Sequence, residues 1–190
     1  MDGGNRKITA LDLGEAELSP DMQAMFDKCV QKFGFAPNVL RAYAHDNAKL
    51  SAFATFYNGL MLAPSGLSKL EREMIAVAVS SQNHCFYCLV AHGAAVRVLS
   101  GQAELGDMLA ANYRLANLPA RQRAMLDFAV KVATASHEIG EADREALRAA
   151  GFADRDIWDI AAVAGFFAMS NRMASAVDLR PNAEYFAMGR

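Results

Sequence analysis

Apolar residues recur at intervals of three and four along most of the chain, and prolines and glycines fall mainly between these periodic stretches. Such spacing is typical of amphipathic helices, whereas strands alternate with a shorter period. Helix ends also carry the expected residues: Ser19-Pro20 suits a first turn, and Gly34 suits the end of the same helix. The pattern therefore predicts an all-α protein, a bundle of helices joined by short turns.

The stretch around which the remaining sequence is arranged begins at Ser68. Ser68 and Glu71 form a capping box, in which each side chain satisfies a backbone N–H of the first turn. The rest of this helix is apolar almost without interruption, as in a helix buried on most of its circumference. Glu73 is the exception, because it lies within about 60° of Leu70 and Val77 on the helical wheel. Its carboxyl group is expected to face protein, and unlike Glu71 it has no capping role.

Three reactive side chains share one face of the next predicted helix. Asn83 is the expected N-cap, which places Cys85 and Cys88 in the first turns and His92 one turn further on. These three residues span an arc of about 60° on the helical wheel. The partial positive charge of a helix N-terminus lowers the pKa of a thiol and favours Cys85 as the thiolate. His92 follows Cys88 by four residues and can take its proton, so the spacing leaves open which cysteine reacts.

Composition and charge indicate which binding partners and which cellular compartment to expect. The 190 residues carry a net charge of -2 with acidic and basic residues interspersed, so nucleic acid is not expected as a partner. The longest apolar run covers about half of the roughly 20 residues that cross a bilayer, and no membrane partner is expected. The N-terminal sequence resembles neither a signal peptide nor a transit peptide, which favours the cytoplasm. In that reducing compartment, three cysteines do not predict a structural disulfide framework.

Other candidate residues are expected to be structural. Cys29 repeats with apolar neighbours in the first predicted helix and is expected to be a small buried side chain outside the site. In the long helix predicted from Asp154, Trp158 belongs to an aromatic stripe expected in the core, and Gly165 is expected to permit close helix packing. The close pair of cysteines is therefore the candidate for catalysis or metal binding.

The second half of the chain resembles a degenerate copy of the first. Residues 118–130 align without a gap on residues 67–79, with the same helix phase and starting turn. Ala124 then stands where Glu73 does, and neither corresponding position holds a cysteine. The second copy lacks the chemistry and is expected to be scaffold. We expect one domain over residues 1–190, comprising an N-terminal arm (about 1–18), an active repeat (about 38–99) and a degenerate repeat (about 104–176).

The order Glu73, eleven residues, Cys85-Phe86-Tyr87-Cys88, three residues, His92 resembles the alkylhydroperoxidase D and carboxymuconolactone decarboxylase superfamily, most closely its peroxidase-related branch. The resemblance implies a helical bundle of the alkylhydroperoxidase D type that reduces hydroperoxides through a cycle of dithiol and disulfide. It also implies that Cys88 attacks the peroxide, that Cys85 resolves the sulfenic acid, and that Glu73 and His92 relay protons. No metal and no organic cofactor is implied.

The same resemblance implies partners. The substrate is a hydroperoxide, and the electron donor is a dithiol, such as a protein of the lipoyl or thioredoxin type. Copies of the chain are expected to form a homo-oligomer, a trimer or a hexamer. Tyr87 stands where alkylhydroperoxidase D proteins often have histidine, so the sequence leaves the particular peroxide and reductant open.

Three alternatives remain at this stage. A decarboxylase of lactone-type carboxylates would keep the fold but would not need a reversible dithiol. Zinc could be held by the two cysteines and His92, together with Glu73 or His84. In the third alternative the cysteines are simply buried, and Glu73 pairs with an arginine such as Arg72 or Arg97.

Overall fold

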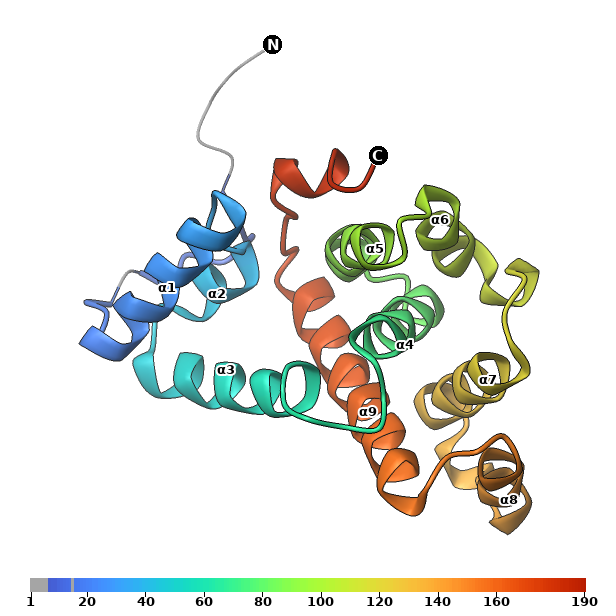
Figure 1. The fold of residues 1–190 in the computed structure, drawn as a ribbon. Coiled ribbons are helices and arrows are strands. Elements are labelled where there is room, and N and C mark those ends of the chain that lie inside the picture. The colour runs from blue at the N-terminus through green and yellow to red at the C-terminus, as the bar shows by residue number, and fades with distance from the viewer. Residues whose placement is uncertain (1–6, 15) are drawn as a thin grey trace.

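The computed structural model describes residues 7–14 and 16–190, and within them the chain forms helices and no strand (Figure 1). This confirms the expected all-α fold. Of the expected N-terminal arm, residues 1–6 and 15 lie outside the described part. No helix in the described part has the length and apolar character needed to cross a membrane. The helices are α1 (Pro20–Phe33), α2 (Asn38–Tyr43), α3 (Asn47–Met61), α4 (Lys69–Gln82), α5 (Phe86–Ser100), α6 (Ala103–Asn112), α7 (Ala120–Thr134), α8 (Glu141–Ala149) and α9 (Asp154–Ala176), with short 3₁₀ helices η1 (Tyr113–Leu115), η2 (Ser136–Glu138) and η3 (Ala183–Phe186).

Local signals in the sequence set the ends of two important helices. The Ser68 hydroxyl accepts the N–H of Glu71 at 3.1 Å, and a Glu71 carboxylate oxygen accepts the N–H of Ser68 at 2.8 Å. These two bonds form the predicted capping box of α4. α1 begins with Pro20 at its first position and ends before Gly34, whose φ of 82° is left-handed. Both boundaries are those that the sequence predicts.

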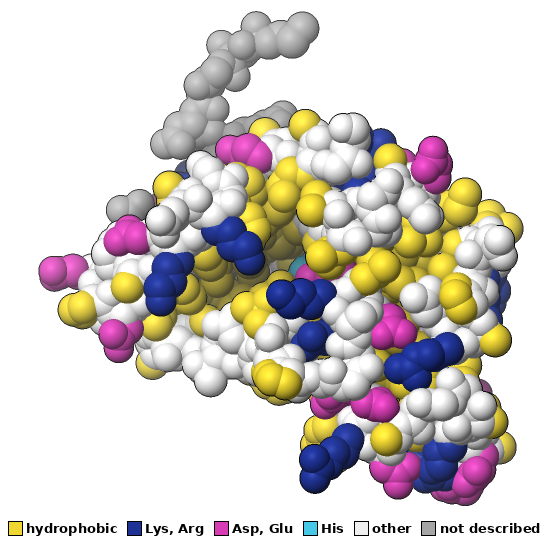
Figure 2. Space-filling model, in the orientation of Figure 1, with side chains coloured by type: hydrophobic (Ala, Val, Ile, Leu, Met, Phe, Trp, Pro, Cys, Tyr) yellow, Lys and Arg dark blue, Asp and Glu magenta, His cyan; other side chains and the backbone are white. Residues whose placement is uncertain are grey.

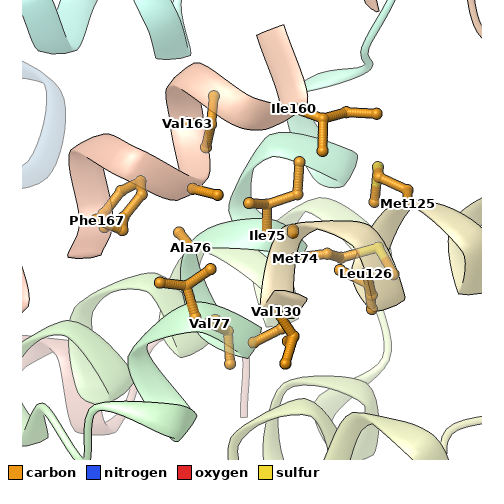
Figure 3. Packing of buried hydrophobic residues seen from close by; sticks show 14 of the residues in the cluster. Met74, Ile75, Ala76, Val77, Met125, Leu126, Val130, Ile160, Val163 and Phe167 are labelled. Atoms are coloured by element: carbon orange, nitrogen blue, oxygen red, sulfur yellow. The ribbon is translucent and has the colours of Figure 1, made fainter. Parts of the chain in front are cut away.

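α4 is the centre of the bundle. It packs against α5, α6, α7 and α9, and nine of its fourteen residues are buried. Because helices surround α4 on several sides, its position is fixed by close packing. Figure 3 shows the apolar side chains that meet there: Met74, Ile75, Ala76 and Val77 from α4, Met125, Leu126 and Val130 from α7, and Ile160, Val163 and Phe167 from α9.

Two expectations for α9 are wrong. Trp158 is 75% exposed, because it lies about 160° around the helix from the fully buried Ile160. A Cβ added at Gly165 would meet no atom of the described residues within 4 Å, so this glycine does not permit a close contact. The close approach is instead between α5 and α6, where a Cβ on Gly106 would lie 2.9 Å from the carbonyl oxygen of Gly93. Periodicity marks the buried face of a helix, but it does not identify which neighbour approaches most closely.

The N-terminal helices stand to one side of the bundle (Figure 1). α1 packs on α3, and α3 packs on α2, α4 and α9, yet no residue of α1 is buried. Val30 and Phe33 in its apolar stripe are 49% and 43% exposed, and Cys29 is only partly buried instead of buried as expected. The apolar face of α1 is therefore open in a single chain.

The C-terminal segment folds back over α5 and α2. Arg97 of α5 is buried and donates to the carbonyl oxygen of Tyr185 at 2.8 Å. Asn38, the first residue of α2, donates its backbone N–H to the side chain of Asn182 at 2.7 Å and its side-chain amide to the carbonyl oxygen of Arg180 at 2.9 Å. These bonds fix the C-terminal segment against two helices that border the cysteines.

Candidate active site

A tight connection between α4 and α5 positions the two cysteines. α4 ends at Gln82, and after Asn83 the backbone of His84 is left-handed, with a φ of 51°. Cys85 is the N-cap of α5, and its N–H donates to the carbonyl oxygen of Ser80 at 3.0 Å. The prediction that Asn83 caps α5 is therefore wrong, because the left-handed residue reverses the chain and moves the cap two positions on. Cys85 lies at the positive end of the α5 dipole.

Both cysteines lie below the surface. Cys85 is 1% exposed and Cys88 is 2% exposed, and both are free thiols. The hydroxyl of Tyr87, which is also buried, accepts the backbone N–H of Val39 at 3.2 Å. Tyr87 therefore connects the first turn of α5 to α2, so the residue that stands where alkylhydroperoxidase D proteins often have histidine has a structural contact. The buried side chains packed with the cysteines are Tyr87, Ala91, Ala174 and Leu179.

The pKa values of the two thiols are shifted in opposite directions. Cys85 has its pKa lowered to about 6, first because the Cys88 thiol donates a hydrogen bond to it. The backbone N–H of Cys88, the Asn171 amide and the nearby His92 lower it further. The pKa of Cys88 is raised well above its usual value, because its proton is held by Cys85 and because it is buried. The reduced pair thus places the negative charge on Cys85 and the proton on Cys88.

Glu73 and His92 form a close pair across α4 and α5. Nδ1 of His92 lies 2.6 Å from a carboxylate oxygen of Glu73, and their side chains are only 13% and 12% exposed. The edge of the His92 ring also meets Phe167 of α9, with 4.6 Å between ring centroids. The structure thus brings together the two residues expected to relay protons. Since Glu73 holds Nδ1, the Nε2 atom is the ring nitrogen available for proton exchange.

His92 influences the dithiol through its charge. Within the described residues no hydrogen bond joins the imidazole to either sulfur, although its proximity lowers the pKa of Cys85. Proton transfer between His92 and Cys88, directly or through a water molecule, stays a prediction.

The other roles considered for Glu73 find no support in its surroundings. Arg72 donates to the carbonyl oxygens of Leu60 and Ala63, and Arg97 donates to carbonyl oxygens of the C-terminal segment. Neither arginine pairs with Glu73, whose partner is His92. Across residues 7–14 and 16–190, no group of three or more His, Cys, Asp or Glu side chains is placed to hold a metal ion. The donor set that a zinc clip would need is therefore not assembled around the cysteines.

Two residues at the dithiol were not singled out from the sequence. Asn171 of α9 and Ser80 of α4 are both fully buried, and the side chains of both lower the pKa of Cys88. The signal for Asn171 was available, because it follows Phe167 by one turn and so lies on the buried face of an apolar helix. A buried amide at such a position needs polar partners.

The fold and the site define an all-α protein with a buried dithiol next to a histidine and carboxylate pair. The chain matches the model of the Carboxymuconolactone decarboxylase family over residues 49–105, which include all four expected site residues. It shares 62% sequence identity with the uncharacterized peroxidase-related protein from Silicibacter sp. TM1040, with 97% of each chain covered and a TM-score of 0.94. The chain therefore belongs to the alkylhydroperoxidase D-like and carboxymuconolactone decarboxylase superfamily.

Two further solved structures show how far the likeness extends. The uncharacterized peroxidase-related protein from Ralstonia eutropha JMP134, described as an alkylhydroperoxidase AhpD core, is 49% identical, with 96% of this chain and 97% of that chain covered and a TM-score of 0.93. The apo debrominase Bmp8 is 19% identical, with 97% of this chain and 96% of that chain covered and a TM-score of 0.76, and shares the fold alone. The sequence matches none of the curated proteins with which it was compared.

Proposed function

We propose that the protein is a thiol-dependent peroxidase, which reduces hydroperoxides while Cys85 and Cys88 cycle between dithiol and disulfide. The observation that carries this proposal is the polarised thiol pair, in which Cys88 donates its proton to a Cys85 sulfur whose pKa is about 6. A thiolate, and not a thiol, is the nucleophile that attacks a peroxide oxygen. The two relatives with 62% and 49% sequence identity are described as peroxidase-related, which agrees with this chemistry.

The reduced pair holds one proton between its sulfurs, and this proton starts the cycle. Cys88 passes it to Cys85 and attacks the peroxide, so that an S–O bond forms as the O–O bond breaks. The departing alkoxide takes the proton from Cys85 and leaves as an alcohol. The Cys85 thiolate then attacks the sulfenic acid, and the S–S bond forms as hydroxide leaves. His92 supplies the proton that converts hydroxide to water, and the peroxide has gained the two electrons that the dithiol lost.

Glu73 orients the histidine in this cycle. Its carboxylate holds Nδ1 at 2.6 Å and stabilises the ring when the ring carries a positive charge. Nε2 is then the nitrogen that gives and recovers the proton. Glu73 comes from α4 and His92 from α5, so the geometry depends on the packing of these two helices.

Single cysteine variants test the proposal. Cys88→Ser should abolish hydroperoxide consumption in the presence of a dithiol reductant. Cys85→Ser should react once and retain a sulfenic acid or a mixed disulfide on Cys88, which intact mass detects. Cys29→Ser is the matched control, because Cys29 lies on α1 outside the site, and it should behave as wild type.

The same variants report which sulfur attacks. If the sulfenic acid accumulates in Cys88→Ser and not in Cys85→Ser, then Cys85, the sulfur with the lower pKa, is the nucleophile. If Cys88→Ser consumes hydroperoxide at the wild-type rate with repeated turnover, the dithiol cycle is wrong.

We further propose that a dithiol of the lipoyl or thioredoxin type re-reduces the disulfide. A dithiol donor resolves its own mixed disulfide, whereas a monothiol needs a second molecule to do so. Dihydrolipoamide and reduced thioredoxin should each be mixed with the oxidised protein, with glutathione for comparison. Faster re-reduction by glutathione would contradict a dithiol donor.

A second candidate is decarboxylation of a lactone-type carboxylate, favoured by the description of the family model that matches residues 49–105. In such a reaction the Glu73 and His92 pair would act as acid and base, and the thiols would not be needed. The Cys85→Ser, Cys88→Ser double variant separates the two candidates. Decarboxylation that persists in this variant, together with no peroxide consumption by wild type, would favour the decarboxylase.

A further inference from the structure

A polar amide lies in the apolar interface between α9, α4 and the start of α5. Asn171 is 0% exposed, and the buried residues on the same face of α9 are otherwise mainly apolar. A buried side-chain amide is costly unless its N–H and C=O groups are hydrogen-bonded. The partners of Asn171 therefore indicate why an amide occupies this position.

The hydrogen bonds around Asn171 fix the direction of its amide. The Asn83 amide nitrogen donates to the carbonyl oxygen of Val79 at 3.1 Å and to the Asn171 side-chain oxygen at 3.1 Å. Because a backbone carbonyl only accepts, the Asn83 atom must be nitrogen, and the Asn171 atom that faces it must be oxygen. The nitrogen of Asn171 therefore points the other way, where it donates to the Ser80 hydroxyl oxygen at 2.8 Å.

The hydrogen-bonded side chains of Asn171 and Ser80 lie next to the cysteines, because the backbone of Ser80 is bonded to that of Cys85. The Ser80 hydroxyl accepts from Asn171 and so keeps its own O–H free to donate, and its side chain lowers the pKa of the Cys88 thiol. The Asn171 side chain lowers the pKa of both cysteine thiols. The carbonyl oxygen of Ser80 also accepts the N–H of Cys85 at 3.0 Å, which holds the cap residue close to this chain of donors.

We propose that Asn171 and Ser80 are positioning residues for the dithiol, which hold hydrogen-bond donors against the two sulfurs and stabilise the reduced, negatively charged pair over the disulfide. The inference rests on the proposed dithiol cycle. A thiolate is a strong acceptor of hydrogen bonds, whereas a disulfide sulfur is a weak one. The donors therefore favour the reduced protein, and their removal makes the dithiol more readily oxidised, as when a reduced form loses its stabilisation.

The variants that test the role of Asn171 and Ser80 leave the other titratable groups near Cys85 and Cys88 unchanged. His92 on α5 is the charged group that lowers the pKa of Cys85, and Glu73 on α4 is the partner of His92. The charge of a Cys88 thiolate would also raise the pKa of Tyr57 on α3 and of Tyr87 on α5, and Tyr185 of η3 in turn raises the pKa of Tyr87. Burial raises the pKa of all three tyrosines, so they stay neutral between about pH 5 and pH 8. A difference in reduction potential or thiolate titration between variant and wild type is therefore due to the loss of the Asn171 or Ser80 side chain.

The test measures the reduction potential and the thiolate titration of Asn171→Leu, a substitution of similar shape, in the full chain carrying Cys29→Ser. Protein and dithiothreitol are brought to equilibrium, in which the protein dithiol gives two electrons and its protons to oxidised dithiothreitol. At about pH 8 the equilibrium should move about tenfold toward the protein disulfide, as expected for loss of a hydrogen bond to a charged group. At about pH 5, where the pair of Cys85 and Cys88 is protonated in both proteins, the shift should vanish.

A general structural defect would not give this dependence on pH. Ser170→Ala is the matched control, since Ser170 is the neighbouring buried polar residue on α9, and its potential should equal that of the parent. Ser80→Ala serves as a second variant if Asn171→Leu does not fold, and it should shift the equilibrium in the same direction. Ultraviolet absorbance of the thiolate should show its titration moved to higher pH in both variants.

The outcomes distinguish this inference from the proposed function. Equal potentials and equal titrations in parent, Asn171→Leu and Ser80→Ala would overturn the positioning role, even if the protein reduces peroxides. A shift that is as large at about pH 5 as at about pH 8 would also overturn it, because it would not arise from the thiolate. A protein that shows the expected shift but consumes no hydroperoxide would contradict the peroxidase and leave the role of Asn171 standing.

Discussion

Two glutamates separated by one residue on α4 have different roles because they face different neighbours. Glu71 accepts the N–H of Ser68 at 2.8 Å and also lies 3.4 Å from Arg121 of α7. Glu73 points to His92 and has only 12% of its side chain exposed. The first stabilises the start of a helix, and the second orients an imidazole. Mutation of each residue should therefore change a different property.

Alanine variants separate these roles. Glu73→Ala should lower the rate of peroxide reduction by about a hundredfold, because the proton relay loses the group that orients it. Glu71→Ala should lower the free energy of unfolding by about 1 kcal/mol through loss of the cap, and should leave the rate near that of wild type. Urea unfolding and peroxide consumption measured on both variants check this. Equal losses of rate in the two variants would contradict the assignment.

The polarised cysteine pair predicts a dependence on pH. The pKa of Cys85 is lowered to about 6, so the reactive monoanion is present above that pH and is lost as the pH falls through it. The rate at which hydroperoxide oxidises the dithiol should rise with pH, be half-maximal near pH 6 and level off above it. Stopped-flow measurement with excess peroxide checks this. A rate that rises only near pH 8.5, the range of an unperturbed thiol, would show that Cys85 is not activated.

At the scale of the elements, the site depends on how closely α5 approaches its neighbours. Gly106 of α6 lies against Gly93 of α5, and an added Cβ would also meet the side chain of Arg97 at 3.0 Å. Arg97 in turn binds carbonyl oxygens of the C-terminal segment. The glycine contact therefore sets the position of a helix that carries Cys88 and His92 near its start.

Two glycine substitutions test this packing. Gly106→Ala should lower the free energy of unfolding by about 1 to 3 kcal/mol, because the new methyl group forces α6 away from α5. Gly165→Ala on α9 is the matched control, since a Cβ there meets nothing within 4 Å in the described residues, and it should raise stability by about 1 kcal/mol through helix propensity. Thermal and urea unfolding give both values. A stabilised Gly106→Ala would mean that α5 and α6 are not in close contact.

At the scale of the whole molecule, a single chain leaves apolar surface open. Figure 2 shows hydrophobic side chains gathered in the hollow between the N-terminal helices and the bundle, with charged side chains around it. No residue of α1 is buried, although its apolar residues repeat with a helical period. Such a face is typical of a surface that another protein chain covers. We propose that copies of the chain cover the apolar face of α1, as in the homo-oligomer that the family resemblance implies.

Light scattering checks the oligomer. The wild-type protein should have the mass of a trimer or a hexamer of its 20.5 kDa chain. Phe33→Glu on the apolar stripe of α1 should reduce that mass, because a charge would be buried between copies. Lys28→Glu changes the charge of an exposed residue on the same helix and should leave the mass unchanged. A wild-type monomer at micromolar concentration would rule out the proposed oligomer.

Much of the fold was predictable because its signals are local. Hydrophobic spacing gives the helices, and the box of Ser68 and Glu71 gives the start of α4, since these interactions span a turn or two of chain. The same periodicity places Cys85, Cys88 and His92 on one face and turns Glu73 toward protein. The cap of α5 was predicted wrongly, because a single left-handed residue at His84 is hard to recognise from residue type.

The sequence by itself determined that the chain is all-α, and it predicted that the chemistry lies in Glu73, Cys85, Cys88 and His92. Only the tertiary structure decided which sulfur carries the charge and which groups surround it. Asn171 approaches the cysteines from α9, more than eighty residues away along the chain, and Glu73 finds His92 only when α4 packs on α5. The physical reason is that thiol charge depends on burial and on donors from several helices, which no spacing within one helix reveals.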